Sequence, residues 1–188
     1  MFLGMGALIG IGAVVLLVII IVGWFISTRN KFIRMDQDVE NSMSRIDVYL
    51  TKRYDLLTKM LQTTKGYTKH EQETLAKVIE MRNPGKSASP KEKMEFNNQM
   101  DQVSRDLNIT VEQYPQLKAD KMFHNLQEAI SEVEENLQAA RSNYNANVAQ
   151  FNKAILVFPA SIVAGNSFTK KEYFEAEEIK KQDVSMEF

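Results

Sequence analysis

The hydrophobic residues of this chain follow two patterns, one continuous and one periodic. Residues 1–28 carry no charged side chain, and the first charge is Arg29. From Arg34 onward, apolar residues recur at steps of three and four, the spacing that places them on one face of an α-helix. No stretch alternates with a period of two for long enough to indicate a strand. The pattern predicts an all-α chain with an apolar helix followed by amphipathic helices.

The uncharged run is long enough to cross a membrane. As a helix rising about 1.5 Å per residue it would cover roughly 40 Å, against a hydrocarbon core of about 30 Å. A cleaved signal peptide is the poorer interpretation, because no basic residue precedes the run and Trp24 stands where a small-residue cleavage site is expected. We predict a single transmembrane anchor over residues 1–28, with Trp24 at the membrane–water interface.

The residues around the anchor predict its orientation. Arg29, Lys31 and Arg34 follow it directly, and no lysine or arginine precedes it. The positive-inside rule therefore predicts an N-terminus outside the cell and a cytoplasmic remainder. Gly6 and Gly10 form a GxxxG pattern, which packs membrane helices against each other. Glycine is also common in membrane helices without such a role, so both interpretations stay open.

The rest of the chain contains three long apolar stripes. No proline occurs in residues 1–65 and no glycine lies between Gly23 and Gly66, so the anchor should continue into the first amphipathic helix, which bends or breaks near Gly66. A loop at 84–90 precedes the second long helix, which ends before Pro115, and the third ends at Pro159. The stripe residues are Val39, Met43, Ile46, Leu50, Leu57 and Met60, then Phe96, Met100, Val103, Leu107 and Val111, then Phe123, Leu126, Ile130, Val133, Leu137, Ala140, Tyr144, Val148, Phe151 and Ile155.

These stripes must be buried against one another, and short connections make successive helices antiparallel. Residues 29–159 are therefore predicted to form an elongated antiparallel up-and-down bundle of three to four helices, followed by a tail at 160–188. Within the tail, Thr169–Lys181 is expected to form a short charged helix. Phe168, Tyr173 and Phe174 are expected either to pack on the bundle or to contact lipid headgroups.

Arg53 is the polar residue that departs from the pattern. It occupies a position on the apolar face between Leu50 and Leu57, where burial without a partner is costly. One interpretation is that its side chain reaches the edge of the bundle. The other is a buried charge pair or polar layer, with an acidic residue or with Asn147, that fixes the register of the helices.

Composition adds mostly exclusions. The chain has no cysteine, and its 23 basic and 24 acidic residues form no dense basic face, so no nucleic-acid partner is expected. His70 and His124 lie in neither an HExxH nor a Glu-x-x-His motif. Asp120 and His124, four residues apart, would suit a metal, but a solvated pair is the commoner outcome. The sequence predicts no catalytic centre and no cofactor, and therefore no enzyme.

Residues 44–71, SRIDVYLTKRYDLLTKMLQTTKGYTKHE, resemble the LemA family of bacterial membrane proteins, and the resemblance continues through YPQLKA at 114–119 to YFEA at 173–176. Two positions depart from the family pattern, with Met43 where it usually has tryptophan and Thr58-Lys59 where it has Pro-Asn. The resemblance implies a single-pass protein of the inner membrane with a helical bundle and no established catalytic residues. Some family members resemble a magnetosome-membrane protein or occur beside membrane proteases of the HtpX type.

Three functions remain open from the sequence. The first is a non-enzymatic membrane scaffold, whose bundle associates with further copies of the chain or with a membrane-protein partner. The second is an accessory subunit of an HtpX-type protease. The third is a bundle that binds a small ligand or a metal around Arg53 or His124.

Overall fold

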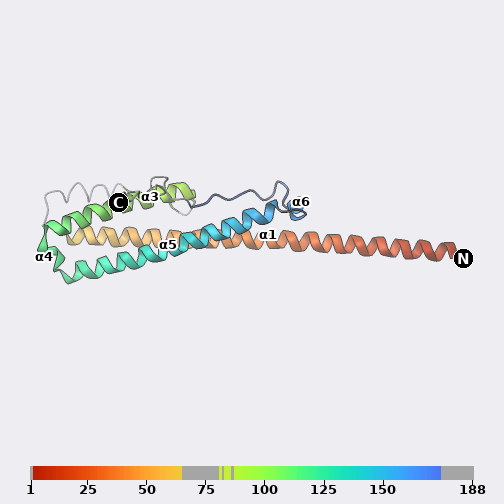
Figure 1. Cartoon of the computed structure of the whole chain (residues 1–188), viewed down its shortest axis with the longest axis horizontal. Coiled ribbons are helices and arrows are strands. Elements are labelled where there is room, and N and C mark those ends of the chain that lie inside the picture. Colours follow the sequence, from red (N-terminus) through yellow and green to blue (C-terminus); the bar gives the residue numbers. More distant parts are fainter. Residues whose placement is uncertain (1, 65–80, 82, 86, 175–188) are drawn as a thin grey trace, which may run out of the picture. The chain divides into compact units, whose positions relative to one another are not determined.

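The computed structural model describes residues 2–64, 81, 83–85 and 87–174 of the 188-residue chain, without the side chains of residues 2–7, 110 and 118. These residues contain no strand, and the all-α prediction is confirmed. The helices are α1 (Phe2–Thr63), α3 (Pro90–Gln113), α4 (Pro115–Lys118), α5 (Lys121–Leu156) and α6 (Ala160–Ala164) (Figure 1). The three long ones match the predicted helices, whereas the short α4 and α6 were not expected.

Helix α1 joins the apolar run to the first amphipathic stripe without a break, as the absence of proline, and of glycine between Gly23 and Gly66, predicted. Its apolar window has a mean hydropathy of 3.0 and is not buried at all, which makes α1 long and apolar enough to cross a membrane. The predicted bend near Gly66 lies outside the described residues.

The chain divides into two compact units. The anchor unit consists of residues 1–40 and 147–171, and the bundle unit consists of residues 41–146 and 172–188. Helices α1 and α5 each contribute one part to both units. The boundaries predicted at residues 28 and 159 stay predictions.

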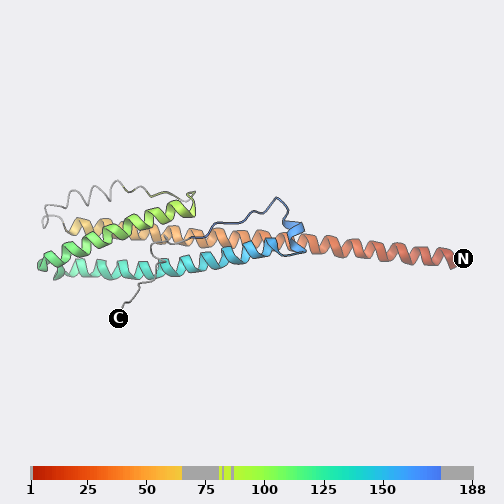
Figure 2. The same cartoon turned by 45° about the horizontal axis from the view of Figure 1, so that its top comes forward.

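In the bundle unit, α3 and the adjoining parts of α1 and α5 lie side by side, and α5 runs antiparallel to the other two (Figures 1 and 2). In this unit the predicted stripes form the core, because all five stripe residues of α3 are buried and, of the α5 stripe residues from Phe123 to Tyr144, only Leu126 is half-buried. Met43 of α1 is half-buried too. Hydrophobic periodicity therefore located the packed faces of the long helices.

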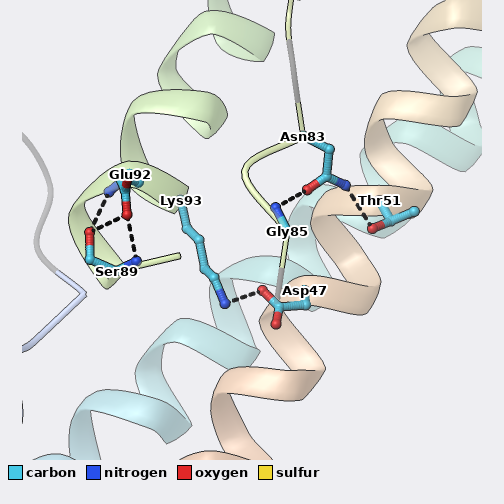
Figure 3. A network of polar contacts seen from close by, with 7 residues as sticks. All are labelled: Asp47, Thr51, Asn83, Gly85, Ser89, Glu92 and Lys93. Carbon is cyan, nitrogen blue, oxygen red and sulfur yellow. Dashed lines mark hydrogen bonds and ion pairs between the residues drawn. The ribbon is translucent and has the colours of Figure 1, made fainter. Parts of the chain in front are cut away.

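Helix α3 begins with a capping box formed by Ser89 and Glu92 (Figure 3). Ser89 Oγ accepts a hydrogen bond from the Glu92 backbone N–H at 3.2 Å, and the Glu92 carboxylate accepts one from the Ser89 N–H at 2.7 Å. That bond to the backbone of Ser89 is the main reason why the pKa of Glu92 is lowered. In the preceding loop, Asn83 accepts a hydrogen bond from the N–H of Gly85, which has a φ of +82° that other residues rarely adopt.

The beginning of the tail differs from the prediction, because Thr169–Phe174 is not helical. Its backbone groups are bound by asparagines of α5 instead. In the anchor unit, the Asn152 amide both donates to the carbonyl and accepts from the N–H of Lys171, at 2.9 and 2.8 Å. In the bundle unit, Asn145 makes the same pair of bonds with Phe174, at 3.0 and 2.8 Å. These bonds satisfy the backbone without a helix, and the rest of the predicted helix lies outside the described residues.

Candidate functional site

Arg53 is buried in the bundle unit, where it joins three helices. Only 3% of this α1 residue is exposed. Its guanidinium lies 2.8 Å from the Asp101 carboxylate of α3 and 2.5 Å from the Glu134 carboxylate of α5. It also donates to Asn97 Oδ1 at 2.8 Å. The side chain therefore does not reach for the edge of the bundle, and its charge is paired where water is largely excluded.

Asn147, the other residue suggested for a polar layer, lies in the anchor unit. Its side chain donates to the Asp38 carbonyl at 3.3 Å. The partners of Arg53 are instead acidic residues that the sequence could not single out, because they lie 48 and 81 residues further along the chain. Partners so distant in sequence cannot be identified from helical spacing, because that spacing relates only residues three or four apart.

A second buried charge links α1 to α3. Lys93 is only 1% exposed, and its ammonium lies 2.6 Å from the Asp47 carboxylate (Figure 3). Sequence reasoning missed this pair, since a lysine in the first turn of a helix ordinarily points into solvent. Two charge pairs of α1, at Asp47 and Arg53, therefore lie against α3 in the bundle unit.

The polar side chains around Arg53 border a cavity of about 560 Å³, here called the Arg53 cleft. That volume lies within the range of small-ligand sites. Arginine side chains line it from all three long helices, with Arg105 on α3 and Arg141 on α5. The full lining consists of Arg53, Asn97, Asp101, Ser104, Arg105, Glu134, Leu137, Gln138, Arg141, Asn145 and Phe174.

The charges of the Arg53 cleft do not cancel. Three guanidinium groups face two carboxylates, and both carboxylates pair with Arg53. Arg141 lies with its guanidinium 5.0 Å from the centre of the Phe174 ring. Burial lowers its pKa, and nearby Arg53 lowers it further, while Asp101 acts in the opposite direction. Among the described residues, no ion pair joins Arg105 or Arg141 to a carboxylate, so the cleft carries an excess of positive charge.

The residues considered for a metal have other partners. The Asp120 carboxylate accepts hydrogen bonds from the N–H groups of Met122 and Phe123, at 2.7 and 3.1 Å, and so caps the start of α5. His124 is exposed, with its Nε2 3.4 Å from a Glu128 oxygen. Within the described part of the chain, no three histidine, aspartate or glutamate side chains are grouped so as to hold a metal ion. His70 lies outside that part.

Aromatic and basic residues gather in the anchor unit, just after the apolar run. The Phe168 ring lies 5.3 Å from Phe32 and 6.3 Å from Phe151, centre to centre. The Arg29 guanidinium lies 5.8 Å from the centre of the Phe168 ring, and Lys171 pairs with Asp36 at 2.6 Å. Phe168 thus packs on protein, as does buried Phe174 in the bundle unit, whereas Tyr173 is exposed. The other residues suggested for the interface and topology, Trp24, Lys31 and Arg34, are exposed.

A comparison with known families identifies the protein family of the chain. Residues 42–188 match the model of the LemA family. The chain belongs to the LemA family. It is also 31% identical over 166 residues to Protein LemA of Metamycoplasma hominis, an alignment that covers 85% of this chain and 74% of that protein.

The match to the LemA family contains the whole lining of the Arg53 cleft, since every lining residue lies between Arg53 and Phe174. It begins inside α1, so the apolar part of that helix precedes the matched residues. Within the matched part, the buried polar groups that lack a hydrogen-bond partner among the described residues include Arg53 Nε and Ser104 Oγ. Both residues line the cleft, and both of these groups are donors that a ligand would satisfy.

Proposed function

We propose that this LemA-family chain is a membrane-anchored scaffold whose helical bundle binds further copies of itself or a membrane-protein partner. The observation that carries the proposal is the composition of α1, a single helix of 62 residues. Its first part is apolar and fully exposed, as a lipid-facing segment would be, and its later part contributes buried residues to the core of the bundle unit. One helix thus supplies both the anchor and a wall of the bundle.

The flanking charges support a cytoplasmic bundle. Arg29, Lys31 and Arg34 are all exposed, and they directly follow the apolar segment. The positive-inside rule places such residues in the cytoplasm and Met1 on the outer side of the membrane. Trp24, also exposed, lies a few residues before Arg29, where an interfacial anchor is expected.

Because the chain contains no cysteine, its topology can be tested with single cysteines. Ser87→Cys places a thiol in an exposed turn of the bundle unit, and Phe2→Cys places one at the N-terminal end of the anchor. A membrane-impermeant maleimide applied to intact cells should label Phe2→Cys but not Ser87→Cys until the cells are permeabilised. Labelling of Ser87→Cys in intact cells would indicate the opposite orientation. Extraction of the chain from membranes at alkaline pH would contradict the transmembrane anchor itself.

The scaffold role itself is tested by crosslinking in native membranes followed by mass spectrometry. The expected products join two copies of the chain, or the chain and one recurring membrane protein. A chain that remains a monomer and captures nothing would contradict the proposal. Copurification with a membrane protease, together with altered turnover of that protease's substrates on deletion, would instead support the accessory-subunit alternative.

A second candidate function is the binding of a small anion in the Arg53 cleft, and the excess of positive charge there favours it. Arginine binds carboxylates and phosphates through two parallel hydrogen bonds. Thermal unfolding with inorganic phosphate or acetate should therefore show a stabilisation that Arg105→Gln removes and that the exposed-site control Arg45→Gln retains. No shift with either anion would exclude both of them as ligands.

A further inference from the structure

The end of α5 exposes a cluster of large apolar side chains. Leu156, Val157, Phe158 and Ile162, here called the apolar corner, are each more than half exposed, and Phe158 reaches 76%. Single exposed apolar residues are ordinary on a protein surface, but four within seven residues form a patch that needs a partner. All four belong to the anchor unit.

The alignment of α5 with α1 gives the position of the apolar corner along the axis of α1. Asn147 of α5 hydrogen-bonds the carbonyl of Asp38 on α1, and the two helices run antiparallel (Figures 1 and 2). Leu156 ends α5 nine residues later, about 13 Å further along. Nine residues before Asp38 on α1 is Arg29, so the apolar corner begins level with the first charge after the uncharged run.

Contacts of the residues that follow the apolar corner in sequence agree with this position along α1. Phe168 follows α6 by four residues, and its ring packs against Phe32 and beneath the Arg29 guanidinium. Val163 and Ala164 of α6 are buried, so this short helix is held by the anchor unit while Ile162 faces outward. The corner is therefore bounded on both sides by contacts with α1 near residues 29–38.

The charges around the corner suit a lipid surface. Residues 147–171 contain three lysines and no acidic residue, and two of these, Lys153 and Lys170, are exposed. The third, Lys171, pairs with Asp36. Exposed aliphatic and aromatic side chains flanked by basic residues are typical of segments that lie in the membrane interface, with apolar groups at the acyl boundary and cations among the phosphates.

We propose that the apolar corner inserts into the interface of the same bilayer that the anchor crosses, so that the anchor unit contacts lipid at two places. The inference rests on the membrane anchor of the proposed function. Lipid fits this surface better than a protein partner because the corner begins level with the end of the proposed lipid-facing run on α1. Lys153 and Lys170 supply the cations that headgroup phosphates attract.

The test uses the full-length chain in vesicles of phosphatidylcholine and phosphatidylglycerol. Phe158→Cys carries an environment-sensitive fluorophore, and Val48→Cys is the matched control. Val48 is an exposed apolar residue of α1, the helix that contains the anchor, and it lies nineteen residues or about 29 Å beyond Arg29. Spin labels on the lipid acyl chains should quench the probe at 158 several-fold more than the probe at 48, and its emission should be blue-shifted. Equal quenching at the two positions would overturn the inference.

Two further measurements separate the other outcomes. Flotation of the vesicles comes first, since a chain that does not float with lipid has no anchor and the proposed function itself fails. A probe at Ile162→Cys should lose its quenching when Phe158→Glu is added and keep it when Val48→Glu is added. A blue shift that appears only at high protein-to-lipid ratio, without quenching by lipid labels, would assign the corner to a second copy and overturn the inference.

Discussion

At the scale of single residues, the described part of the bundle unit contains two charged side chains almost fully withdrawn from water, Arg53 and Lys93. A buried guanidinium is tolerated when its charge is neutralised and most of its donors are satisfied, and Asp101, Glu134 and Asn97 do this at Nη1 and Nη2 of Arg53, which leaves Nε without a partner among the described residues. Such pairs seldom add stability over a well-packed apolar side chain, but breaking them leaves a charge without compensation. Removal of a carboxylate partner and removal of Arg53 itself should therefore lower the free energy of unfolding by different amounts.

We predict that Asp101→Ala lowers the free energy of unfolding by about 3 kcal/mol, because buried Arg53 then keeps only the partly exposed Glu134 as a carboxylate partner. Arg53→Leu should be less damaging, since the two carboxylates that it releases are partly exposed and can be hydrated. Urea unfolding of the full-length chain in mild detergent, followed by circular dichroism, measures both. A larger loss for Arg53→Leu than for Asp101→Ala would contradict this account, and unchanged self-association of Arg53→Leu would argue against a role in helix register.

Tyr144 offers a prediction about pH. Its hydroxyl donates to the Glu172 carbonyl at 2.8 Å, and burial, aided by the charge of Glu172, raises its pKa to about 12. In the unfolded chain the pKa of tyrosine is about 10. Between pH 10 and 12 the folded state therefore holds a proton that the unfolded state has lost, and stability falls as the pH rises through this window. Below pH 10 the contribution is complete.

The matched variant is Tyr144→Phe, which cannot ionise. From pH 10 to pH 12, the wild-type chain should lose more of its free energy of unfolding than the variant loses, although other groups titrate in both. Denaturant unfolding at a series of pH values gives the two slopes. Parallel curves for the two proteins would mean that Tyr144 ionises equally easily in the folded and unfolded states.

At the scale of elements, the long helices were predictable because each buries one face, and burial of one face imposes a period near 3.6 that is visible in sequence. The capping box at Ser89 and Glu92 was predictable for a similar reason, since its bonds join residues three apart. The segment Thr169–Phe174 was not, because its backbone is bound by Asn145 and Asn152 from a distant helix. Of the residues that line the Arg53 cleft, the sequence singled out only Arg53 as a candidate site residue, because the others become its neighbours only when the helices pack.

Loss of the cap should weaken α3 measurably. Ser89→Ala removes the side-chain oxygen that accepts from the Glu92 N–H, and such losses typically cost about 1 kcal/mol. Ser87→Ala is the control, since Ser87 lies in the same loop, is exposed and precedes the cap by two residues. Denaturant unfolding should show a loss of stability for Ser89→Ala only. Equal stability of both variants would show that water replaces the cap without loss.

At the scale of the whole molecule, the apolar run proposed as the membrane anchor and one wall of the bundle belong to the same helix. The apolar run was evident from composition alone, because a lipid-facing segment tolerates no charge over its length, and α1 carries it into the bundle unit without interruption. Association between copies is different, since it depends on surfaces whose complement lies in another molecule. Within one copy, Gly10 has no neighbouring atom within 4 Å of where a Cβ would stand, so a side chain there meets nothing.

That open space makes Gly10 a clean probe of self-association, the last prediction. Gly10→Ile should leave each copy folded and should reduce crosslinking between copies in native membranes, because the GxxxG face of Gly6 and Gly10 could no longer pack closely. Gly12→Ile is the matched control. Gly12 has equally open surroundings but points about 160° away around the helix, at 100° per residue. Equal crosslinking in both variants would exclude this face as the contact, and any association would then have to use the bundle.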